Sequence, residues 1–171
     1  MAMNEKREYI TSLNFAMIKY YAGKPAQIQH FIKVHSFAKL IGVCEKLSSE
    51  VLFILEAAAL VHDIGIKPAM ELYRNSNGKL QEKLGPLEAE KMLAALDFNT
   101  SVIERVCYLV GHHHTYDNIE GLDYQILVES DFLVNFYESK YETKTVHQIN
   151  ETIFQTETGK LLLNEIYPLN K

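Results

Sequence analysis

The sequence predicts an all-α protein, a single-domain bundle of about six to eight helices. Apolar residues recur at helical spacing along most of the chain, and no segment shows the alternation typical of a half-buried strand. No internal repeat, low-complexity tract or clear second domain is visible, and 47% hydrophobic residues in a chain of 171 suffice for one core. We therefore expect one domain over residues 1–171.

The expected helices begin and end at recognisable signals. They cover residues 4–21, 27–47, 51–64, 86–96, 100–112 and 123–138, with one or two more over 145–166. The first helix ends before the segment "AGKP", where Gly23 and Pro25 break it. Ser48 or Ser49 is the expected N-cap of the third helix.

Polar segments separate the later helices. The segment "YRNSNGKLQEKLG" is expected to be a loop over 73–85, after which Pro86 fits the first turn of the fourth helix. Thr100 or Ser101 is the expected cap of the fifth helix. Residues 139–144 are polar and are expected to form a surface connection before the last helices.

Charge and composition limit the functional classes. The formal net charge of −5 argues against a general nucleic-acid binder. No charged and apolar leader opens the chain, and no uncharged run reaches the roughly 20 residues that span a bilayer, so we expect a cytoplasmic protein without membrane contact. Cys44 and Cys107 lie in apolar helical patterns and are expected to be buried, reduced thiols. The oligomeric state stays open.

The stretch "AAALVHDIG" places two ionisable residues at the end of an apolar helical run. At 100° per residue His62 shares a helix face with Leu55, Ala58 and Ala59 and therefore points inward. A lone buried histidine is more often satisfied by one hydrogen bond. Asp63 changes this balance, because a buried carboxylate needs a partner or a metal ion.

Two further segments direct similar groups into the interior. In the second helix His30 lies in the middle of the apolar stripe, whereas His35 lies about 140° away on its flank. In "YQILVESDFLVN" Asp131 shares its face with apolar residues, where an unpaired carboxylate would be costly. Three helices thus each place a His or Asp inward, which suggests a metal site.

This ordered set resembles the HD superfamily of metal-dependent phosphohydrolases, whose pattern is a His, a His-Asp doublet and a distant Asp. "HFIKV" with Ala38 is similar to the first element, "AAALVHDIG" to the doublet and "ILVESDFLVN" to the last. The resemblance covers a core of 27–137, with the first and last helices as additions. It implies an HD-domain-like bundle. The ligands it implies for one divalent transition metal (Fe, Mn, Zn, Co or Ni) are His30, His62, Asp63 and Asp131.

Two departures from the family pattern bear on the chemistry. Relatives with two metals usually carry another His before a Gly at the start of a core helix, and Leu84 occupies that position in this chain. A second ion is therefore expected to bind weakly. Some single-metal relatives carry a water-activating Glu three residues after the doublet, where this chain has Ile66.

Three consecutive histidines occur in "GHHHTYD" at 111–117. Histidines at a helix C-terminus interact favourably with the helix macrodipole and cap free carbonyl groups, so a purely structural role is one interpretation. The family resemblance instead places an active-site pair on His112 and His113, contacting substrate or a second ion. Which of these two and His114 line the site stays open.

Cationic residues near the doublet are candidates for binding phosphate. Lys67 follows the doublet closely, and Lys79, with Asn75 and Ser76, lies in the expected loop. All of these groups can donate to phosphate oxygens, although solvated loop charge is the simpler interpretation.

The resemblance implies a metal-dependent phosphohydrolase that releases phosphate from a small substrate, with a nucleotide favoured, by attack of metal-bound hydroxide. Asp63 or Asp131, through an oxygen not on the metal, or His113 would take the proton, and Lys67 or a histidine would stabilise the departing charge. A single tight metal favours monoester over diester cleavage. The alternative is a non-catalytic HD module that binds metal and nucleotide as a sensor.

Overall fold

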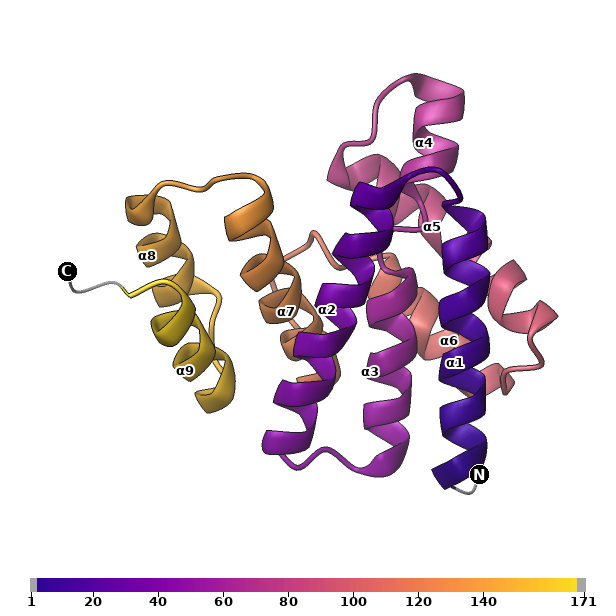
Figure 1. The fold of residues 1–171 in the computed structure, drawn as a ribbon, viewed down its shortest axis with the longest axis horizontal. Helices are drawn as coiled ribbons and strands as arrows, with labels where there is room; N and C mark the ends of the chain where they lie inside the picture. The colour runs from indigo at the N-terminus through magenta and orange to yellow at the C-terminus, as the bar shows by residue number, and fades with distance from the viewer. Residues whose placement is uncertain (1–2, 169–171) are drawn as a thin grey trace.

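Helices joined by short turns make up residues 3–168, the part of the chain that this computed structural model describes (Figure 1). The nine helices within this range are α1 (Met3–Tyr20), α2 (Pro25–Cys44), α3 (Ser49–Val61), α4 (Ile66–Tyr73), α5 (Gly78–Ala95), α6 (Thr100–Val110), α7 (Leu122–Glu138), α8 (Thr143–Thr152) and α9 (Glu157–Ile166). The described residues form no strand, and the all-α fold class is confirmed.

Helix α3 is the centre of the bundle. It packs against α1, α2, α6 and α7, and every residue from Leu55 to Val61 is buried. A helix that is apolar on nearly all sides is stable only when neighbours cover all of it. Its C-terminal end therefore delivers the His62–Asp63 pair directly into the interior.

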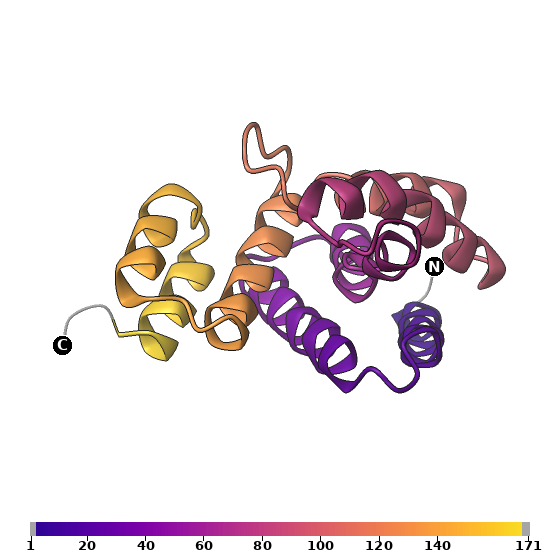
Figure 2. The same ribbon diagram turned by 90° about the horizontal axis from the view of Figure 1, so that it is seen from above.

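Helix α7 is the second buried element. It packs against α2 and α3 and, through its outer face, against α9. Seen from above, α8 and α9 form a pair on the far side of α7 from α1 (Figure 2). The rings of Phe136, Phe154 and Tyr167 meet at this junction. Because both faces of α7 are covered, Asp131 in its middle is buried.

The predicted caps are partly correct. Ser48 caps α3, since its side chain accepts a hydrogen bond of 3.3 Å from the Val51 amide. Helix α6, however, is capped by Asn99 and not by Thr100 or Ser101, because the Asn99 side chain accepts from the Ser101 amide. Asparagine is as good an N-cap as serine, and it stands one residue earlier.

The predicted loop over 73–85 is wrong. Helix α4 ends at Tyr73, the first residue of the predicted loop. Only residues 74–77 form a connection, and α5 already begins at Gly78. Pro86 consequently lies inside α5 and not in a first turn. The helix packs closely against the turn before α4, where a Cβ added at Gly65 would lie 2.6 Å from the Gln81 carbonyl oxygen. Asn77 caps α5 by accepting from the Leu80 amide.

The cysteines are free, but Cys44 is exposed, which corrects the expectation that both thiols are buried. It is the last residue of α2 and lies beyond the packed stripe of that helix. Cys107 is half-buried and donates from Sγ to the Pro86 carbonyl.

Across residues 3–168, none of the helices has the length and apolar character to cross a membrane.

Candidate metal centre

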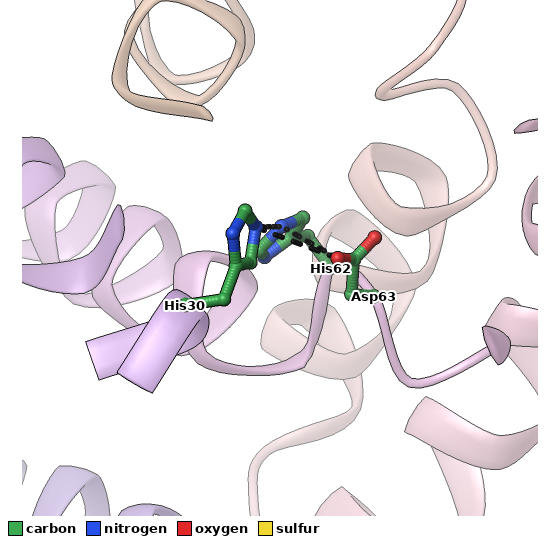
Figure 3. A group of neighbouring side chains, drawn as sticks. All are labelled: His30, His62 and Asp63. Atoms are coloured by element: carbon green, nitrogen blue, oxygen red, sulfur yellow. Dashed lines mark hydrogen bonds and ion pairs between the residues drawn. The ribbon is translucent and has the colours of Figure 1, made fainter. Parts of the chain in front are cut away.

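Three elements bring the four predicted ligand residues together. His30 comes from α2, His62 is the C-cap of α3, Asp63 follows it in the turn, and Asp131 comes from α7. Figure 3 shows His30 with its ring directed toward His62 and Asp63. Residues about 100 positions apart thus meet where α3 ends between α2 and α7.

The ligand atoms are spaced as in a coordination sphere. His30 Nε2 lies 3.2 Å from His62 Nε2, 3.4 Å from Asp63 Oδ2 and 3.1 Å from Asp131 Oδ1. His62 Nε2 lies 3.6 Å from each of the two carboxylates. A metal ion with bonds of about 2.1 Å separates neighbouring ligand atoms by roughly 3.0–3.4 Å. Two imidazoles and two carboxylates at this spacing fit a divalent transition ion.

The opposite ring nitrogens fix the tautomers of these histidines. His62 Nδ1 donates to the Ala59 carbonyl at 2.9 Å, and His30 Nδ1 donates to Glu138 Oε2 at 2.8 Å. Carbonyl and carboxylate oxygens only accept, so Nδ1 carries the proton in each ring. With Nδ1 engaged in each ring, both Nε2 atoms face the centre, where a metal ion would bind them in place of a proton.

The centre holds two ionised carboxylates. Burial alone would raise the pKa of Asp63, but the neighbouring His62, His113 and His30 lower it well below its usual range. Burial also raises the pKa of Asp131, but His30 and His62 lower it by more, so that it lies below its usual range. Two ionised carboxylates in the interior need a cation close by. Although burial lowers the pKa of His30, the surrounding carboxylates raise it to about 9.

A second group of potential ligands adjoins the first through Asp63. Whereas Asp63 Oδ2 faces His30 and His62, its Oδ1 lies 3.4 Å from His113 Nε2. His113 donates from Nδ1 to the Val110 carbonyl, and its buried Nε2 makes no hydrogen bond within the described part of the chain. Asp63, His113 and His114 have ligand atoms within 4.8 Å of one another. An ion here would share Asp63 with the first site.

His114 is held on the α5 side of this group. Its ring lies 4.0 Å from that of His113, and its Nε2 lies 3.3 Å from Gln81 Oε1. Burial and the neighbouring His113 lower the pKa of His114 to about 4, so the ring is neutral at physiological pH. A Cβ added at Gly78 would lie 2.8 Å from this ring, so glycine lets α5 approach it closely.

The structure does not bring every predicted residue to the centre. His112 donates from Nδ1 to the Tyr108 carbonyl at 2.7 Å and stacks on the Tyr108 ring, so it has the capping role and His114 is the residue beside His113. Lys67 is exposed, with Nζ 4.4 Å from the centroid of the Tyr20 ring. Lys79 is exposed in the first turn of α5, next to Gly78.

Sequence reasoning missed Glu138 and Lys33. Glu138 accepts from His30 through Oε2, and Lys33 forms an ion pair with its other oxygen. Burial raises the pKa of Glu138, but Lys33 and His30 lower it overall, so Glu138 is ionised. A signal was available, since Glu138 follows Asp131 by seven residues and so shares its face of α7.

Comparisons with known proteins agree with this geometry. The family model of the HD domain matches residues 28–153. A solved structure described as a predicted HD superfamily hydrolase from an uncultured Thermotogales bacterium is similar to the chain, with 26% identity and a TM-score of 0.64. The match covers 98% of this chain and 91% of that one. No curated protein matches.

Proposed function

The chain belongs to the HD-domain family, and from that premise we propose that it is a phosphohydrolase that releases phosphate from a small phosphorylated substrate, with a nucleotide favoured. Family membership, the similar hydrolase and the His/Asp cluster support the coarser statement that it is a metal-dependent hydrolase. The phosphoester chemistry and the nucleotide are our own inference.

One observation carries the proposal. The Nε2 atoms of His30, His62 and His113 point toward Asp63 and Asp131, while each Nδ1 is engaged by an acceptor of the protein. A set of imidazoles used only for packing would not need three ring nitrogens converging on two carboxylates, one of them, His113 Nε2, buried without a hydrogen bond among the described residues. We assign the first metal to His30, His62, Asp63 and Asp131.

The chemistry divides between the ion and the residues. When bound, a divalent ion supplies Lewis acidity and lowers the pKa of water toward neutrality. The residues hold and orient the reacting groups: Asp63, between the two ligand groups, carries a negative charge through which it can accept a proton. His113 Nε2 beside it is the second candidate for this role. His30, anchored by Glu138, keeps its ring in one orientation.

Local positive charge is needed for an anionic substrate in a chain of net charge −5. Lys33 is 40% exposed next to Glu138 and His30, which makes it a candidate that the sequence alone did not suggest. Lys67 and Lys79 stay candidates for more distant parts of the substrate, since both are exposed. Both the metal ion and these ammonium groups would then compensate the negative charge of a phosphate group bound between them.

We favour monoester cleavage because a single tightly bound metal favours it, and the second ligand group offers fewer ligands to an ion than the first. It has Asp63, His113 and His114 but no further imidazole, because α5 carries Leu84 where two-metal relatives place a histidine. A second ion would therefore bind weakly.

The experiment is a panel of nucleoside mono-, di- and triphosphates and cyclic diesters, incubated with protein loaded with Mn²⁺, Co²⁺, Zn²⁺, Ni²⁺ or Fe²⁺. We expect phosphate release from a monoester that chelator abolishes. The His62→Ala variant is the matched control for contaminating phosphatases, since it removes a ligand of the first site.

The second candidate function is a non-catalytic module that binds metal and nucleotide. Ile66 favours it, because some relatives carry a water-activating glutamate at this position. Tight nucleotide binding by the metal-loaded protein without turnover of any panel member would support this alternative over the hydrolase.

A further inference from the structure

A cavity of about 610 Å³ lies away from the metal centre and shares no lining residue with it. Helices α1, α2 and α3 lie side by side with α3 between the other two (Figures 1 and 2). Residues of all three helices line the cavity, and we call the side lined by α3 its floor. Its apolar surface includes Ile10, Phe15, Leu52 and Phe53. The volume lies within the range of about 300–1,000 Å³ typical of small-molecule sites.

A charged network is built into this cavity. Glu56, in the middle of the apolar helix α3, is only 8% exposed. Its Oε1 accepts from His35 Nε2 at 3.0 Å and from Lys39 Nζ at 2.8 Å. Burial raises the pKa of Glu56, but His35 and Lys39 lower it overall, so the carboxylate is ionised and compensated. Replacing such a network by apolar residues is often neutral or stabilising, so folding alone does not call for it.

The remaining charge of the lining is positive. Lys6 and Arg7 of α1 face the same cavity, and Glu56 is the only acidic residue among its lining residues. Lys6 Nζ bonds to Ser49 and to the exposed Glu50. The guanidinium of Arg7 forms no ion pair with any residue of the range 3–168. A cationic rim above an apolar floor, on a chain of net charge −5, is complementary to an anion with an apolar body.

We propose that this cavity is a second binding site, specific for a small organic anion with an aromatic or aliphatic body. The anionic group meets Arg7 and Lys39 at the rim, and the body covers Phe53 and Leu52 on the floor. Glu56 fixes the positions of His35 and Lys39 and so shapes the rim. The proposal does not depend on the proposed hydrolase function, and binding alone tests it.

A small ligand is favoured over a second copy of the chain. A self-complementary contact would juxtapose Lys6, Arg7 and Lys39 of one copy with the same cations of the other, and like charges oppose such pairing. An anion removes this repulsion. Exposed Phe15 in the lining offers a ring on which an aromatic body can stack.

Two fluorescent probes with the same ring system test the proposal. The first is 8-anilino-1-naphthalenesulfonate, and the second is N-phenyl-1-naphthylamine, which lacks only the sulfonate. We expect the anion to bind native protein at one site per chain and more tightly than the neutral probe. Arg7→Glu should weaken binding of the anion by roughly tenfold or more, because it reverses a charge at the rim.

Two further variants complete the design. Lys19→Glu makes the same change of charge on α1 at an exposed position outside the cavity, and it should leave binding unchanged. Asn14→Trp should block both probes by filling the cavity. Thermal melts verify that each variant is folded.

Three results would overturn the proposal: equal binding of both probes, equal effects of the two charge reversals, or binding of the anion that Asn14→Trp leaves intact. Sedimentation of a dimer that Phe15→Glu dissociates would also overturn it, because the cavity would then be covered by a second copy.

Discussion

His30 Nδ1 lies 2.8 Å from Glu138 Oε2, and this contact joins the N-terminal part of α2 to the end of α7. A backbone carbonyl anchors His62 in the same way, so that in both rings Nδ1 is engaged and Nε2 is directed into the centre. A carboxylate behind a metal-binding imidazole orients the ring and makes it a stronger ligand. Lys33 in turn holds Glu138.

The first prediction concerns this anchor. Glu138→Ala should weaken metal affinity by roughly 10–100-fold while leaving the metal stoichiometry at saturation unchanged, because no ligand of the first site is lost. Calorimetric titration with Mn²⁺ measures both quantities. Glu151→Ala removes an exposed carboxylate on α8 and serves as the control. Identical affinities in the two variants would mean that Glu138 does not position His30.

The second prediction separates the two histidines of α2. His30→Ala should abolish metal binding, because it removes a ligand that lies 3.1–3.4 Å from three others. His35→Ala should retain the metal, since His35 faces Glu56 on another side of the helix. Elemental analysis of the two purified variants decides this, and the reverse pattern would refute the ligand set.

The third prediction concerns the number of metals. Titration of the native protein should show one tight binding event and, at most, a much weaker second one. His114→Ala should remove the weak event and leave the tight one, because His114 belongs only to the second ligand group. Two tight events in the native protein, together with preferential diester cleavage, would contradict our preference for a monoesterase.

The fourth prediction concerns the junction of α7 and α9. Glu129 is fully buried, and its Oε1 accepts from the Gln155 and Thr156 amides. Glu129→Ala leaves these donors unpaired and should destabilise the protein by about 3–5 kcal/mol. Gly159→Ala should also destabilise it, because the added Cβ would lie within 1.9 Å of Glu129 Oε2.

Denaturant unfolding measures both effects of this fourth prediction. Asn164→Ala, at an exposed position of α9, is the control. Since the two sites are in contact, the double variant should cost less than the sum of the single ones. A strictly additive result would show that the contact is absent.

The fifth prediction concerns pH. The pKa of Glu56 is lowered in the folded protein, so Glu56 stabilises the fold above its unfolded pKa and loses this contribution as the pH falls through the folded value. Glu56→Gln should therefore reduce stability near pH 7 by about 1–3 kcal/mol and have a smaller effect near pH 3, below the unfolded pKa. Denaturant unfolding at both values tests this, and an effect that grows on acidification would have the wrong sign.

Much of the fold could be predicted from the sequence, because α2, α3 and α7 carry long apolar patterns with clear ends. The segment around Pro86 could not. Its polar residues and its proline indicated a loop, whereas the segment is helical and packs closely against Gly65, which is a tertiary contact. Local propensity does not contain such contacts.

The candidate site was predictable to a similar degree. Helical register placed His30, His62 and Asp131 inward, and the structure brings them together. The family resemblance placed His112 at the site, whereas the structure gives it a capping role on the Tyr108 carbonyl. In the turn after α6, His114 instead joins Asp63 and His113 and packs against Gly78. The direction of a side chain in a loop cannot be predicted unless the backbone conformation of the loop is known.

The central claim is tested most directly by phosphate release from a nucleoside monophosphate panel with native protein and with Asp131→Asn, each stripped of metal and then supplied with Mn²⁺. Asp131→Asn keeps the size of the side chain but removes its charge from the centre. We predict metal-dependent release by the native protein that the variant loses. Phosphate release that survives in Asp131→Asn, or metal-loaded native protein that releases none, would contradict the account.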